Sequence, residues 1–329
     1  MKPLSKMALI LALGISLTGL AACGGGGKKD DDKDDQAQNG FPADFQLFQQ
    51  DGIWKITTDI DFSHSLTVNT GGNTVTGSAS GTAFYVTQLS VDYADDSHIR
   101  FTHCDEDMPD DFSLQDLEQD LYFQDTDTDD LVCTNERHTY TRINDDTYTI
   151  EIACDNAFSA VITAIRVSDG TGFNAGTFSF NGPETYPSLN ADSGVCGELG
   201  GAHGTAVFPD GSGIPDQSFE TFEIVAAARS YGQDPNVHPV ALEMEFTVTP
   251  EVGAYTVVAG GMDPGPDEVG YVQLTSAVFG QTAEDPASIL ATGGTVTITA
   301  ITDSAVSGTF DLQTDQGNFS GSFDYDLNQ

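Results

Sequence analysis

Short apolar runs of period two follow one another from residue 51 to residue 167. Alternating apolar and polar positions are typical of strands whose two faces differ. Turn-forming residues such as Gly71-Gly72, Gly81 and Asn144-Asp145-Asp146 separate the runs. The pattern predicts eight strands, over residues 52–60, 64–69, 73–78, 82–92, 98–104, 131–143, 147–154 and 158–167. Because a meander of this kind can close on itself and so remove its edges, we expect it to be barrel-like.

One long insertion interrupts the meander between Cys104 and Cys133. The insertion is rich in acidic residues. Within it, Ser113-Leu-Gln-Asp116 has the spacing of a helix capping box, which predicts a short helix from Ser113 through Phe123.

The strand pattern pauses after residue 168, where prolines and the glycine-rich stretch 197–204 predict a long, loop-rich junction. Beyond it the alternation is clean, which indicates two-faced strands of a sandwich or antiparallel barrel. Apolar residues occupy one face at Leu242, Met244, Phe246 and Val248, at Val296, Ile298 and Ala300, at Val306, Phe310 and Leu312, and at Phe319, Phe323, Tyr325 and Leu327. We therefore expect an all-β chain with two antiparallel domains, a meander over 41–170 and a β-sandwich over 171–329.

The first 22 residues predict export. Two lysines precede a mostly apolar run over 7–20, which is the pattern of a signal peptide and is short for a membrane-spanning helix. The sequence Leu20-Ala21-Ala22-Cys23 then resembles the lipobox of the bacterial lipoprotein class. That resemblance implies cleavage after Ala22, lipid attachment to Cys23 and, because Gly24 follows, an outer-membrane location. Two or three acyl chains anchor a protein stably.

Residues 24–40 hold only one apolar side chain, Ala37, and therefore predict a flexible, charged tether. The whole chain carries a formal net charge of −40. Phosphate backbones and anionic lipid headgroups repel such a surface, so we expect neither nucleic-acid binding nor electrostatic membrane docking. The membrane is then a partner only through the N-terminal lipid.

Four cysteines remain after Cys23, and an even number in an exported chain predicts two disulfides. No pair has the spacing of a structural zinc site. We expect Cys104 to pair with Cys133 across the base of the insertion, which leaves Cys154 for Cys196. A Cys133–Cys154 bridge is the alternative. The four residues concerned are Cys104, Cys133, Cys154 and Cys196.

Two further resemblances concern the domains. Gly52-Ile53-Trp54, with the only tryptophan of the chain, opens the eight-strand meander and resembles the start of lipocalin-like barrels. The resemblance implies an arginine from the last strand over the indole, and Arg166 occupies that strand. The stretches 294–299, 307–310 and 321–324 are similar to the C-terminal hairpins of uncharacterised secreted bacterial lipoproteins, which implies a β-sandwich and no activity.

The clearest candidate for a metal site is the acidic stretch that begins at Asp125. Carboxylates at alternate positions followed by a closing glutamate are the oxygen ligands of calcium loops. The stretch lacks the glycine of an EF-hand, and a solvated acidic loop is the alternative. The candidate calcium ligands are Asp125, Asp127, Asp129 and Glu136.

No motif of nucleophilic catalysis or phosphate binding stands out. There is no Gly-x-Ser-x-Gly elbow, and the adjacent carboxylates of residues 105–111 do not form the separated pair of a glycosidase. We therefore expect no catalytic residues and no cofactor other than calcium. The sequence predicts a non-enzymatic envelope lipoprotein that serves as a binding or structural module for an envelope protein. A lipocalin-like carrier of a small apolar ligand and a calcium-dependent adhesion module are the alternatives.

Overall fold

The computed structural model describes residues 50–70, 73–95, 98–104, 110–113, 134–155, 157–184, 186, 188–229, 240–258, 264–276 and 287–329. Strands dominate these residues, which contain no helix. The 18 strands form one connected sheet that is not closed, and their pairing is antiparallel except between two short strands. The all-β fold class is therefore confirmed.

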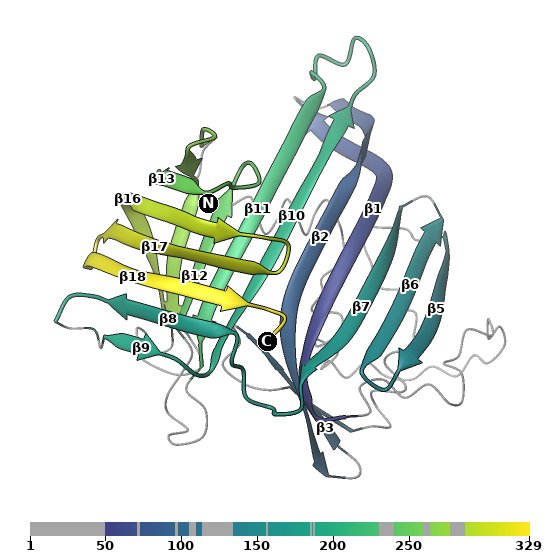
Figure 1. Cartoon of the computed structure of the whole chain (residues 1–329). Coiled ribbons are helices and arrows are strands. Elements are labelled where there is room, and N and C mark those ends of the chain that lie inside the picture. Colours follow the sequence, from purple (N-terminus) through teal and green to yellow (C-terminus); the bar gives the residue numbers. More distant parts are fainter. Residues whose placement is uncertain are drawn as a thin grey trace.

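Ten neighbouring strands make up the layer that we call the large sheet (Figure 1). Their spatial order is β5 (Thr134–Asn144), β6 (Thr147–Asp155), β7 (Phe158–Ser168), β1 (Gly52–Thr70), β2 (Asn73–Asp95), β10 (Val195–Val207), β11 (Gln217–Ala228), β12 (Val240–Phe246), β15 (Tyr271–Ser276) and β16 (Ala287–Ile301). Beyond this layer, β3 (His98–His103) pairs with the end of β2, and β4 (Asp110–Ser113) pairs with β3.

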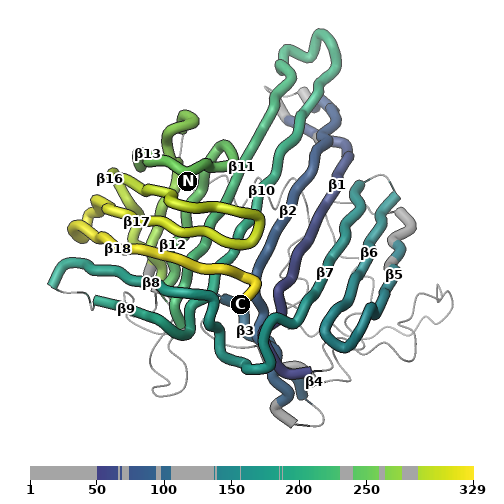
Figure 2. Tube along the Cα trace, viewed as in Figure 1, coloured from purple at the N-terminus to yellow at the C-terminus, as the bar shows by residue number. Residues whose placement is uncertain are grey.

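The second half of β16 passes into another layer, the small sheet. On one side of β16 the small sheet continues with β13 (Gly253–Val257) and then β14 (Glu268–Val269). On the other side it continues, in spatial order, with β17 (Ala305–Thr314), β18 (Gly317–Asp326), β8 (Gly176–Asn181) and β9 (Leu189–Ala191). The small sheet lies across β10, β11 and β12, as the tube in Figure 2 shows. We call the side of the large sheet that meets it the front face, and the other side the back face.

The main hydrophobic core fills the space between the two sheets. Leu199, Ile224 and Leu242 of the large sheet are buried against Phe310 and Phe323 of the small sheet. Successive side chains of a strand point to opposite faces, so the alternation in β12, β17 and β18 predicts this core correctly. Two positions of the predicted apolar faces differ. Val248 lies beyond the end of β12 and is only half-buried. Ala300 of β16 is exposed, because a bulge between Ile298 and Ala300 shifts its register.

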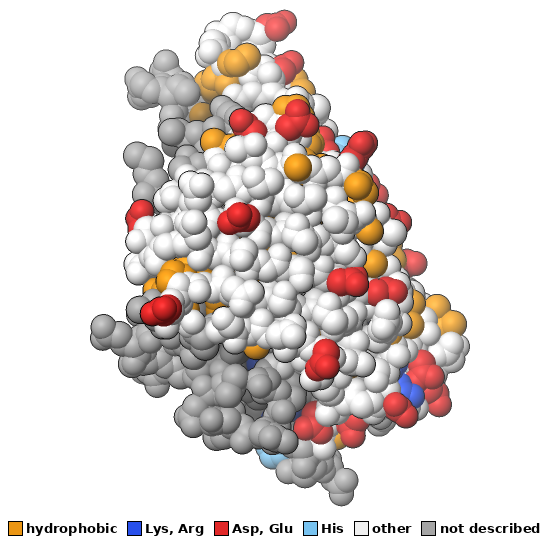
Figure 3. Space-filling model, turned by 60° about the vertical axis from the view of Figure 1, so that its left-hand side comes forward, with side chains coloured by type: hydrophobic (Ala, Val, Ile, Leu, Met, Phe, Trp, Pro, Cys, Tyr) orange, Lys and Arg blue, Asp and Glu red, His pale blue; other side chains and the backbone are white. Residues whose placement is uncertain are grey.

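Uncharged polar side chains cover the outer face of the small sheet. Thr297 of β16 lies opposite Thr309 of β17, which in turn lies opposite Ser322 of β18. The Ser322 hydroxyl lies 2.8 Å from that of Ser179 in β8. Figure 3 brings this side of the molecule forward and shows mostly uncharged atoms with scattered acidic side chains. The density of negative charge is therefore low on this side of the molecule.

Several glycines that predict turns lie inside strands. β1 and β2 each replace two of the predicted strands, and β10 replaces much of the predicted loop. A Cβ at Gly81 would come within 2.8 Å of the Phe62 ring, and a Cβ at Gly197 within 2.4 Å of the Tyr325 ring. These glycines give aromatic rings room to cross the strands instead of turning the chain.

The disulfide pairing differs from the one that we expected. Cys104 forms a disulfide with Cys196, with a Cα–Cα distance of 5.6 Å. The expected Cys104–Cys133 and Cys154–Cys196 pairs are therefore wrong. The reason is that β10 pairs with β2, a contact between distant parts of the chain that brings the start of β10 to the end of β3. Cys154 is also disulfide-bonded, and Cys133 lies outside the described residues.

The meander does not close into the expected barrel, because β2 pairs with β10 and the sheet continues across residue 170. The division into domains at that residue stays a prediction.

Arg166 does lie opposite Trp54 in the register of β1 and β7, and its Nε donates a 2.6 Å hydrogen bond to Asp146. The predicted helix after Ser113 lies outside the described residues, and Ser113 itself ends β4.

Candidate functional site

Most of the predicted site residues lie outside the described residues. This applies to the lipidation site Cys23 and to three of the four calcium ligands, Asp125, Asp127 and Asp129. The fourth, Glu136, belongs to β5. Lipidation and calcium binding therefore stay predictions.

Calcium titration tests the acidic loop. If the loop binds calcium, isothermal titration calorimetry of the wild-type protein should show binding, and Asp127→Ala should weaken it at least tenfold because a chelating carboxylate is lost. Asp59→Asn, at an exposed position of β1, should leave this binding unchanged. If neither the wild-type protein nor Asp127→Ala releases or absorbs heat on calcium addition, the prediction of a calcium site in this loop is wrong.

The back face of the large sheet carries a band of polar side chains between apolar clusters. Glu198 of β10 is only 8% exposed, and its carboxylate accepts hydrogen bonds from the hydroxyls of Tyr85 and Thr87. Two apolar clusters lie on this face, one toward each end of the strands: the first contains Trp54 and the second contains Phe62. Hydrogen bonds from neutral donors offset part of the cost of burying this carboxylate.

Three more glutamates extend this band. Glu223 of β11 lies opposite Glu245 of β12, and Glu243 is two residues away on the same face. One carboxylate oxygen from each lies within 4.8 Å of the others, and the Gln273 amide donates a hydrogen bond to Glu243. Oxygen groups at such distances suit a hard cation such as calcium. A cluster of acids in so acidic a chain does not by itself establish a metal site.

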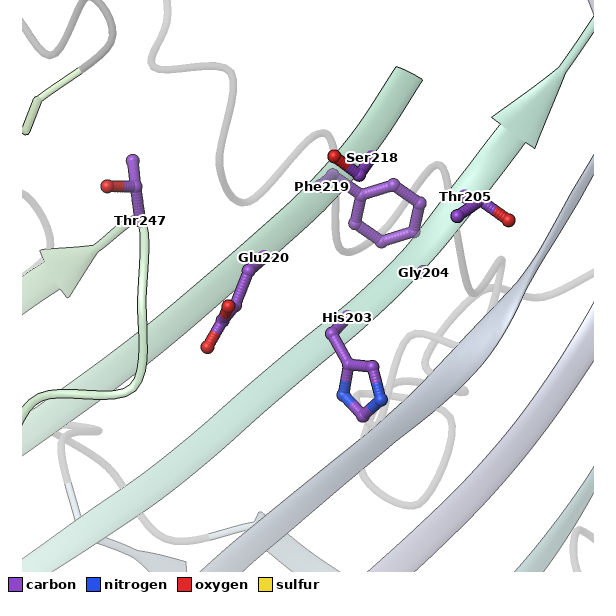
Figure 4. A pocket seen from close by; sticks show the side chains of 7 residues that line it. All are labelled: His203, Gly204, Thr205, Ser218, Phe219, Glu220 and Thr247. Atoms are coloured by element: carbon purple, nitrogen blue, oxygen red, sulfur yellow. The ribbon is translucent and has the colours of Figure 1, made fainter. Parts of the chain in front are cut away.

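A hollow of about 470 Å³ opens where the β10–β11 hairpin extends beyond the small sheet. Figure 4 shows the side chains that line it. They are His203, Gly204, Thr205, Ser218, Phe219, Glu220 and Thr247. Polar side chains and the Phe219 ring therefore line the hollow together, and it is open to solvent.

The β10–β11 register explains how the polar groups of the hollow meet. His203 lies opposite Glu220, and Thr205 lies opposite Ser218. Since the two pairs are two residues apart on their strands, all four side chains share the front face. Cross-strand neighbours of this kind have Cβ atoms about 4.5–5.5 Å apart.

Hydrogen bonds hold two of these side chains in place. A ring nitrogen of His203 lies 3.3 Å from the Thr82 hydroxyl. Glu220 Oε1 accepts hydrogen bonds from the Thr249 amide, at 2.8 Å, and from the Thr249 hydroxyl, at 3.1 Å. Among the described residues, Ser218 has no hydrogen bond to His203, so the hollow does not contain the hydrogen-bonded pair of a serine nucleophile and its base.

Neither the back-face glutamates nor the hollow was predicted. Glu243 and Glu245 occupy alternate positions in the sequence, which does place them on one face of a strand. Their approach to Glu223, and that of His203 to Glu220, depends on strand register. A single sequence contains no signal for this register.

His64 lies in surroundings that shift its pKa. Its ring lies on β1 near Phe62, with ring centroids 5.9 Å apart, and its Nδ1 is buried without a hydrogen-bond partner among the described residues. Burial lowers the pKa of His64 below 6.5, because it disfavours the charged imidazolium.

The lowered pKa of His64 predicts a pH-dependent stability. The contribution of the neutral ring is present above the unfolded pKa of 6.5 and is lost as the pH falls through the lower folded value. We expect the free energy of unfolding, measured by urea titration, to fall less between pH 7.5 and pH 5 in His64→Phe than in wild type. Ser65→Ala, an exposed neighbour, should behave like wild type. Equal losses in His64→Phe and wild type would contradict the prediction.

Comparisons with known proteins give no relative: no family model, no curated protein and no solved structure matches the chain. Within the described ranges, no helix has the length and apolar character needed to span a membrane.

Proposed function

We propose that the protein is an envelope lipoprotein, anchored through lipid on Cys23, whose β-rich body is a non-enzymatic binding or structural module. The lipobox supports the anchor, and the acidic tether of residues 24–40 supports a body that stands away from the membrane. The same lipid accounts for membrane attachment of a chain whose net charge of −40 opposes adsorption to anionic lipids.

The observation that carries this proposal is the Cys104–Cys196 disulfide within the body that follows the lipobox. Disulfides of this kind form and persist in oxidising compartments, such as the bacterial periplasm and the cell surface, and are rare in the cytosol. An exported body and an export signal with a lipid-acceptor cysteine are consistent with each other. The alternative of a closed lipocalin-like carrier has less support, because the sheet is open.

Cell fractionation tests the anchor. Expressed in a Gram-negative host, the wild-type protein should remain in the outer-membrane fraction after washes with high salt and be released by detergent. Cys23→Ser should disappear almost completely from the outer-membrane fraction, because it lacks the lipid acceptor. Gln36→Ala, within the tether, should fractionate like wild type. Cys23→Ser that still co-purifies with washed outer membranes would contradict the proposal.

A further inference from the structure

We propose that the hollow on the β10–β11 hairpin binds a neutral saccharide, with one sugar ring over the side chains of His203, Thr205, Ser218 and Glu220. The inference rests on the proposed role of the body as a binding module and names the class of ligand. It is carried by the register of β10 and β11, which brings these four hydrogen-bonding groups together on one face.

The four groups offer the mixture of donors and acceptors that sugar hydroxyls require. Thr205 and Ser218 carry hydroxyls that both donate and accept hydrogen bonds, and an imidazole does so through its two nitrogens. The Glu220 carboxylate accepts through Oε2, because both of its hydrogen bonds to Thr249 use Oε1. All four side chains are exposed, so a ligand reaches them without displacing the core.

Part of the site is already held in position. Two hydrogen bonds from Thr249 fix Glu220, and Thr82 contacts the His203 ring. The strands themselves are continuous through the site, since β10 pairs on one side with β11 and on the other with β2. Side chains that are fixed before binding lose less entropy when the ligand arrives.

Other classes of ligand fit the hollow less well. An anion would meet the Glu220 carboxylate in a chain of net charge −40. The described residues bring three metal-ligating groups together only at Glu223, Glu243 and Glu245, which lie on the back face. An apolar ligand would have to cover hydroxyls and a carboxylate, at a cost in desolvation. A neutral, hydroxyl-bearing ligand avoids all three difficulties.

Calorimetric titration of the full mature protein, kept in detergent, tests the inference with maltotetraose, cellotetraose and chitotetraose as neutral probes and tetragalacturonate as the anionic one. We expect at least one neutral probe to bind with a dissociation constant on the order of 1 mM or below. Glu220→Gln and Ser218→Ala should each weaken that binding, Glu220→Gln by about tenfold because a hydrogen bond to a charged acceptor is lost.

The control is Asp59→Asn, which removes one negative charge from an exposed front-face position on β1 and should leave binding unchanged. Both hollow variants change exposed side chains, so thermal melts should show that they fold like the wild-type protein. No heat from any neutral probe, binding of tetragalacturonate alone, or equal affinity in wild type and both hollow variants would each overturn the inference. If the wild-type protein binds a saccharide but is found to carry no lipid on Cys23, the proposed anchor is contradicted, whereas the inference of a saccharide site is supported.

Discussion

Replacing Cys104 and Cys196 together by alanine is expected to lower the free energy of unfolding by about 4–5 kcal/mol. The two cysteines are 92 residues apart in the sequence, so the disulfide closes a long loop and restricts the unfolded chain strongly. Both side chains are fully buried, at 0% exposure, and alanine avoids placing a new hydroxyl there. Urea unfolding followed by circular dichroism measures the difference.

The matched control for the disulfide is Val161→Ala, an exposed position on β7, which should change the free energy of unfolding by less than about 0.5 kcal/mol. A loss below about 1 kcal/mol in the double alanine variant would mean that the bridge contributes little. Peptide mapping of the unreduced wild-type protein should recover Cys104 and Cys196 in one linked pair.

Trp54→Ala is expected to cost about 3–5 kcal/mol of stability. The indole is 0% exposed and packs on the Tyr148 ring, with centroids 5.4 Å apart. Its Nε1 also donates a 3.2 Å hydrogen bond to the Gln50 carbonyl. Removing the side chain therefore leaves a large cavity in the back-face cluster that β3 helps to form. Denaturant unfolding followed by circular dichroism provides the measurement.

Ile143→Ala serves as the control for Trp54, because Ile143 is 61% exposed and its truncation should be nearly neutral. Trp54→Phe should retain part of the stability, since an aromatic ring still fills much of the site. A loss under about 1 kcal/mol in Trp54→Ala would contradict the burial of the indole. In the wild-type protein, this single tryptophan also provides a fluorescence signal for unfolding.

Hydrophobic alternation predicts the strands well where one face is buried and the other wet. The core positions of β17 and β18, such as Phe310 and Phe323, follow directly from it. The alternation is less informative where aromatic rings cross the sheet. Gly81 and Gly197 are residues that normally indicate turns, but each lies within a long strand. An aromatic ring occupies the space that a side chain would fill at each position.

The candidate sites were harder to predict than the strands, because they depend on contacts between distant segments. Cys196 meets Cys104 because β10 pairs with β2, and Glu220 meets His203 only in the register of the β10–β11 hairpin. A one-residue change of register would move either group to the opposite face. Composition and spacing predict that such groups exist and leave their partners undetermined.

Mass spectrometry of the N-terminal tryptic peptide, residues 23–28, tests the central claim most directly. In protein extracted from membranes, the proposed anchor predicts that this peptide begins at Cys23 and carries the mass of a diacylglyceryl group and an additional acyl chain on its amino group. A mature N-terminus elsewhere, or Cys23 without lipid, would contradict the account.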